Sequence, residues 1–128
     1  MKYLFSILLL FLALDLFANE PMLRETQYQY VASSIGKGKP YFLEVGSDSC
    51  HSCQIMGKLL YKVHKKYPQY EIHFINVKKE REAAYALKIQ MIPTQLIFDA
   101  QGREVYRHVG LLTTNDLMKT LHQYLDQE

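Results

Sequence analysis

Cys50 and Cys53 are the residues of this chain whose types and spacing most clearly permit chemistry. They are its only two cysteines and form a C-x-x-C motif with His51 and Ser52 between them. The motif follows a predicted buried strand and begins a predicted helix, whose positive N-terminal end would favour a thiolate on Cys50. Cys53, one helical turn later, can reach the same sulfur and resolve a mixed disulfide. The spacing therefore predicts a redox-active pair.

Other uses of this motif fit the sequence less well. A disulfide across C-x-x-C closes too short a loop to stabilise a fold, and a zinc site would need further ligands. Covalent haem attachment needs a histidine directly after the second cysteine, where this chain has Gln54. Copper binding stays open, because Cys50, His51, Cys53 and Met56 are all suitable ligands. We assign no metal and no cofactor, and keep a copper-binding or copper-delivery module as an alternative.

Eight elements that would position the cysteines are predicted from apolar periodicity and turn residues. In chain order they are a helix over Arg24–Ile35, a strand over Tyr41–Val45, a helix from Cys50 to Tyr67, a strand over Tyr70–Val77, a helix over Glu80–Leu87, strands over Thr94–Phe98 and Glu104–Val109, and a helix capped by Thr114 or Asn115 that runs through Tyr124.

The order of these elements predicts an α/β fold. The first two strands flank a helix, as in a right-handed parallel crossover. The last two are joined by the turn Asp99–Gly102 and form an antiparallel hairpin. A mixed four-stranded sheet with helices on both faces follows.

The N-terminal residues differ from the rest of the chain. Lys2 precedes an apolar run over residues 4–14, and the small residue Ala18 follows. This pattern predicts a signal peptide over residues 1–18 and one domain over residues 19–128, exported to an oxidising compartment. A buried N-terminal helix and an uncleaved membrane anchor are the alternatives. The formal net charge of +2 gives no reason to expect a nucleic-acid partner.

The stretch Phe42–Leu121 resembles thioredoxin. Its matching features are the strand before C-x-x-C, the triplet Ile92-Pro93-Thr94 about forty residues later, and Val109-Gly110 before the last helix. The resemblance implies a thioredoxin fold with a cis Ile92–Pro93 bond beside the cysteines. It also implies that the backbone of Ile92 pairs with an extended substrate, close to Gly110. Alternatively, Pro93 only begins a strand and Gly110 is an ordinary loop glycine.

Glu44 lies six residues before Cys50, inside an apolar run. The resemblance implies that it is a buried acid that takes the proton of the second cysteine, Cys53. Burial would raise its pKa into the range useful for proton exchange. A solvent-facing acid at a strand edge is the alternative. The family often places a lysine near this acid, and Phe74 stands at that position here.

The residues around the motif determine the expected direction of the chemistry. Thioredoxin has a tryptophan before its first cysteine, and this chain has Ser49. An imidazolium at His51 would stabilise the Cys50 thiolate and make the protein more oxidising, so His51 and Ser52 are candidate tuning residues. We expect a potential between the extremes of the family. The remaining histidines are interpreted as surface or satisfied core residues: His64, His73, His108 and His122.

These features predict an exported, periplasmic thiol–disulfide oxidoreductase that reduces protein disulfides. Its partners would be proteins with disulfides or thiols and a membrane electron carrier that reduces the pair again. A disulfide oxidase or isomerase would run the same chemistry in the other direction. A non-catalytic peptide-binding module that uses the groove beside Pro93 is a further alternative.

Overall fold

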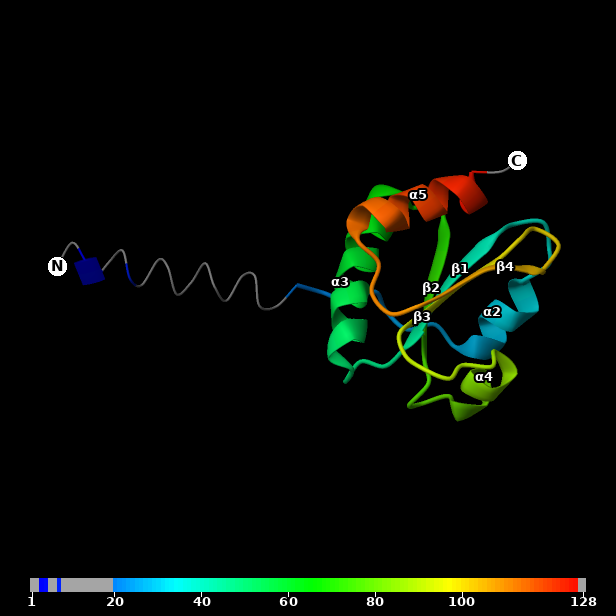
Figure 1. Ribbon diagram of the computed structural model, residues 1–128, viewed down its shortest axis with the longest axis horizontal. Coiled ribbons are helices and arrows are strands. Elements are labelled where there is room, and N and C mark those ends of the chain that lie inside the picture. The colour runs from blue at the N-terminus through cyan, green and yellow to red at the C-terminus, as the bar shows by residue number, and fades with distance from the viewer. Residues whose placement is uncertain (1–2, 5–6, 8–19, 127–128) are drawn as a thin grey trace.

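A four-stranded mixed sheet forms the centre of the computed structural model, which describes residues 3, 4, 7 and 20–126 (Figure 1). Its elements are α2 (Tyr28–Ser34), β1 (Tyr41–Gly46), α3 (His51–Lys66), β2 (Glu71–Asn76), α4 (Arg81–Ala86), β3 (Thr94–Phe98), β4 (Glu104–Val109) and α5 (Thr114–Leu125). The predicted signal peptide falls outside the described residues, apart from three isolated positions. No described helix is both long and apolar enough to cross a membrane.

The strand order is β2-β1-β3-β4. Strand β1 pairs parallel to β2 and antiparallel to β3, and β3 pairs antiparallel to β4. This arrangement confirms the predicted α/β thioredoxin fold with a mixed four-stranded sheet. The register places Glu44 in the middle of the sheet, with Phe74 opposite it on β2 and Gln95 opposite it on β3.

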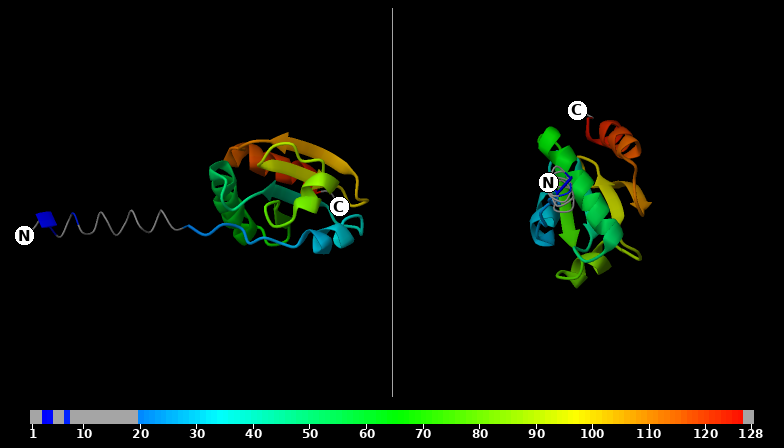
Figure 2. Two further views of the ribbon diagram at one scale, coloured as in Figure 1. Left: turned by 90° about the horizontal axis from the view of Figure 1, so that it is seen from below. Right: turned by 90° about the vertical axis from the view of Figure 1, so that its left-hand side faces the viewer.

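Helices cover both faces of the sheet, α3 and α5 on one and α2 and α4 on the other (Figures 1 and 2). Successive side chains of a strand point to opposite faces. Accordingly, Phe42 packs with the α3 and α5 core, whereas Leu43 and Val45 pack with the core under α2 and α4. Glu44 therefore points from β1 toward α3, the helix that begins at the cysteine motif.

The first helix is shorter than predicted, because it begins at Tyr28 and not at Arg24. The preceding residues instead lie along the free edge of β2. The amide of Thr26 donates to the carbonyl of Phe74 on β2, whereas the amide of Leu23 donates to the carbonyl of Gly57 on α3. The bond to Phe74 satisfies a backbone group that a lone edge would expose. The cap of α5 also differs from the prediction, since the hydroxyl of Thr113 accepts the amide of Asp116.

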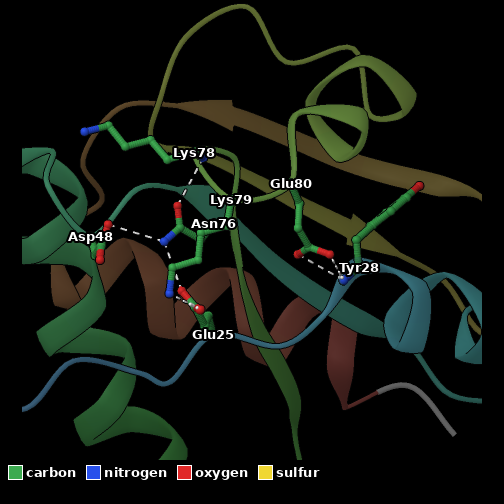
Figure 3. A network of polar contacts seen from close by, with 7 residues as sticks. All are labelled: Glu25, Tyr28, Asp48, Asn76, Lys78, Lys79 and Glu80. Carbon is green, nitrogen blue, oxygen red and sulfur yellow. Dashed lines mark hydrogen bonds and ion pairs between the residues drawn. The ribbon is translucent and has the colours of Figure 1, made fainter.

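Asn76 connects this N-terminal segment to the loop before the cysteines (Figure 3). Its buried side-chain amide donates to Glu25 at 2.9 Å and to Asp48 at 3.3 Å. Its oxygen accepts the amide of Lys78, and the ammonium of Lys79 pairs with Glu25 at 2.6 Å. The end of β2 thus restrains the loop that leads into α3.

Candidate active site

Cys50 and Cys53 lie at the N-terminus of α3, as the sequence predicts. Cys50 is the N-cap residue, with extended backbone angles, and its sulfur accepts the amide of Cys53 at 3.4 Å. Both cysteines are free thiols, Cys50 half-buried and Cys53 only 1% exposed. Cys50 is thus the thiol that a partner can reach, at the end of the helix.

Cys53 packs against the end of β1. A Cβ atom on Gly46 would come within 2.9 Å of the Cys53 sulfur, so the strand must end in glycine for the helix to approach this closely. Burial, more than the neighbouring Cys50 and Glu44, raises the pKa of Cys53. Cys53 therefore stays a protonated thiol until a base accepts its proton. The strand is one residue longer than the predicted Tyr41–Val45, and no feature of the sequence pattern had indicated this contact.

Glu44 is a buried acid, 1% exposed, and the solvent-facing alternative is wrong. Burial, opposed by a hydrogen bond from Gln95 and reinforced by the charge of Cys50, raises its pKa to about 8. Phe74 occupies the neighbouring position on β2, so no cation faces the carboxyl from that strand. The charge of Glu44 contributes to the raised pKa of Cys53, which shows that the carboxyl lies close to the buried thiol.

A hydrogen-bonded row crosses the sheet from Glu44 to β4. The amide nitrogen of Gln95 lies 3.2 and 3.3 Å from the two carboxyl oxygens of Glu44 and 3.0 Å from the carbonyl oxygen of Gly110. The amide oxygen of Gln95 lies 2.6 Å from Nδ1 of His108. The sequence pattern predicts no role for Gln95, and it predicts His108 to be a surface or satisfied core residue. A polar residue inside the apolar strand Thr94–Phe98 was the available signal.

The Ile92–Pro93 peptide bond is cis, and β3 begins directly after it. Because Val45 and Val109 are both register partners of Thr94, this loop, the end of β1 and Gly110 lie at one end of the sheet. The amide of Gly110 donates to the carbonyl of Pro93 at 2.8 Å. Among the described residues, no atom outside Gly110 and its two chain neighbours lies within 4 Å of a Cβ built on Gly110, so its φ of +101° is what favours glycine.

The remaining candidates contribute less to the site. His51 is exposed and makes no hydrogen bond to Cys50, and Ser52 is half-buried, within the described part of the chain. Met56 is fully buried in the core, where its sulfur lies 3.4 Å from the amide of Leu112, so it is not available as a copper ligand. The described residues contain no cluster of three or more His, Cys, Asp or Glu side chains that could hold a metal ion.

A C-x-x-C dithiol at a helix N-terminus, on a mixed sheet and above a buried acid, defines a thiol–disulfide oxidoreductase of the thioredoxin type. The model of the thioredoxin-like domain family matches residues 29–125. The chain therefore belongs to this family, and it is a thioredoxin-like oxidoreductase with the pair Cys50 and Cys53. No curated protein matches the chain.

Solved thioredoxins share this fold at low sequence identity. Thioredoxin NaTrxh from Nicotiana alata is 22% identical, with a TM-score of 0.70 over 84% of this chain and 97% of its own. Fasciola hepatica thioredoxin is 21% identical, with a TM-score of 0.69 over 80% and 99% of the two chains. Mitochondrial thioredoxin 3 from Saccharomyces cerevisiae is 17% identical, with a TM-score of 0.65 over 80% and 94%. These likenesses concern the fold.

Proposed function

We propose that this protein reduces disulfides in exported proteins. The observation that carries the proposal is the contrast between the two thiols. Cys50 is accessible at the helix end, whereas Cys53 is buried behind it beside Glu44. Cys50 can therefore attack a disulfide of the partner, and Cys53 can then release the partner from Cys50.

The reaction follows from this arrangement. The Cys50 thiolate attacks one sulfur of a substrate disulfide, that bond breaks, and the departing substrate sulfur takes up a proton. Glu44 then accepts the proton of Cys53, and the Cys53 thiolate attacks the sulfur of Cys50. The second substrate thiol leaves, so the substrate gains two electrons and the pair becomes a disulfide. A membrane electron carrier is the proposed source of the electrons that reduce this disulfide again.

The Cys50 charge gives the two steps an order. While Cys50 is a thiolate, its charge raises the pKa of Glu44. Formation of the mixed disulfide removes that charge, so the pKa of Glu44 falls and more of the carboxyl is in the deprotonated form that can accept a proton. Glu44 thereby becomes available when Cys53 needs to lose its proton.

The environment of Cys50 supports the reducing direction. Strong oxidants of this chemistry stabilise the reduced form, in which the accessible sulfur is a thiolate. Here the amide of Cys53 is the only backbone donor to the Cys50 sulfur among the described residues, and the imidazole of His51 makes no hydrogen bond to it. This weak stabilisation favours a reductase over an oxidase.

The reduction potential of the pair, measured by equilibration with glutathione, tests this direction. We expect a value from about −270 to about −200 mV. Replacement of His51 by alanine should change it little, because the exposed imidazole makes no hydrogen bond to the Cys50 sulfur. A value near about −120 mV would contradict the reductase proposal and identify the protein as a disulfide donor.

Export rests on the predicted signal peptide, and a cleavage experiment tests it. The full chain is expressed in a bacterium with two membranes, and the protein is recovered from the periplasmic fraction. Mass spectrometry should show a chain that begins at Asn19. A chain that keeps Met1 in the cytoplasmic fraction would contradict export, and one that keeps Met1 in the membrane fraction would identify residues 1–18 as an anchor.

A further inference from the structure

Gln95 is a fully buried amide whose hydrogen-bonding groups are all used. Its nitrogen donates toward both carboxyl oxygens of Glu44 and to the carbonyl of Gly110. Its oxygen faces Nδ1 of His108. In the described part of the chain, no other side chain is hydrogen-bonded to Glu44. The lysine that the family often places near this acid is replaced here by Phe74. Gln95 is therefore the side chain that contacts the Glu44 carboxyl in its stead.

The chemistry of the neighbours determines which way the Gln95 amide points. The carbonyl of Gly110 can only accept a hydrogen bond, so the amide nitrogen must face the side that holds Gly110 and Glu44. The amide oxygen must then face His108. Because that oxygen can only accept, Nδ1 of His108 carries the hydrogen. At 2.6 Å, this contact holds the amide in a single orientation.

We propose that Gln95 and His108 are positioning residues for the proton acceptor Glu44: Gln95 stabilises the Glu44 carboxylate, and His108 orients Gln95 so that it can. The proposal rests on the function proposed above, in which Glu44 takes the proton of Cys53. Only that proton moves, from the sulfur of Cys53 to the carboxylate of Glu44. The Gln95 amide keeps its hydrogens, so His108 acts through orientation and not as a proton relay.

The arrangement explains how this buried acid can work without a nearby lysine. A hydrogen bond donated to a carboxylate favours its charged form, which opposes the effect of burial. The titratable groups that face Glu44 are Cys50 and Cys53 from α3, and His108 reaches it through Gln95. Strand β2 contributes Phe74, which carries no charge. The Gln95 amide is therefore the neighbour that favours the charged form of Glu44.

The carboxyl titration of Glu44 tests the proposal directly. The protein is labelled with ¹³C at glutamate and studied in the disulfide form, in which neither cysteine titrates. We expect Gln95→Leu and His108→Leu each to raise the pKa of Glu44 by about one pH unit, the scale of losing one hydrogen bond to a charged group. His108→Asn should keep the native value, because its side-chain amide can donate from nearly the same position as Nδ1. His64→Leu, a half-buried histidine on α3, is the matched control.

A kinetic measurement gives a second readout. The step in which Cys53 releases a mixed disulfide is followed in a single turnover against pH. Its midpoint should move to higher pH in the two leucine variants and stay in place in His108→Asn. Should Gln95→Leu fail to fold, the comparison of His108→Leu with His108→Asn carries the test alone, since His108 is only half-buried.

Unchanged titration of Glu44 in His108→Leu would overturn the proposal, and so would an equal change in His108→Asn. The titration uses no substrate and does not depend on the direction of electron flow. An oxidising potential would therefore contradict the proposed reductase and leave this result intact. Conversely, an unperturbed Glu44 would remove the positioning role while the potential still supported a reductase.

Discussion

Replacement of Cys53 by alanine is expected to reduce multiple-turnover disulfide reduction by about three orders of magnitude, while Cys50 still reacts once with its substrate. The physical reason is the division of roles between an accessible and a buried thiol. Without Cys53, nothing displaces the substrate from Cys50, so a mixed disulfide accumulates. Non-reducing electrophoresis and mass spectrometry of the trapped adduct measure this outcome.

The matched control makes the same substitution at the other cysteine. Cys50→Ala should also lose turnover, but it should form no adduct, because the buried Cys53 cannot reach a protein substrate. If Cys50→Ala trapped substrates and Cys53→Ala did not, the assigned roles would be reversed. Substrates captured by Cys53→Ala in a periplasmic extract would in addition identify the proteins on which this oxidoreductase acts.

Replacement of Glu44 by glutamine is expected to stabilise the fold increasingly as the pH rises. The folded protein holds the Glu44 proton up to about pH 8, whereas the unfolded chain releases it near 4.5. The native state therefore loses stability as the pH rises through this window, and the loss is complete above about 8. In the native protein this loss of folding free energy reaches about 5 kcal/mol, because each unit of pKa difference corresponds to about 1.4 kcal/mol. The Glu44→Gln variant has no carboxyl at this position and avoids the loss.

Urea unfolding of the dithiol form at pH 4.5, 6.5 and 8.5, with a reductant present, measures this effect. The buried glutamine amide leaves hydrogens without an acceptor, which costs about 1–3 kcal/mol at every pH. The diagnostic quantity is therefore the change with pH of the difference between variant and native protein. Glu82→Gln, at an exposed position on α4, is the control and should show no such change. A pH-independent difference for Glu44→Gln would contradict a protonated buried acid.

The sequence alone was sufficient for the order of elements and for the reactive pair. Strands β3 and β4 have the predicted bounds, and α3 begins at the cysteine motif and ends before Pro68. These features depend on local rules: apolar periodicity, turn residues and the inability of proline to continue a helix. The chemistry of Cys50 is local in the same sense, because a helix N-terminus favours a thiolate in any fold.

Contacts between residues far apart in the chain were decided by the tertiary structure. The predicted first helix included Glu25 and Thr26, yet these residues lie against the edge of β2 because that edge offers hydrogen bonds. Gly46 is required by Cys53, and Gln95 acts on Glu44 only because the strand register sets them opposite each other. The sequence therefore determined which thiols react. The packing of β1, β3 and β4 decided which groups surround Glu44, the proposed acceptor of the Cys53 proton, because those neighbours meet only through sheet register.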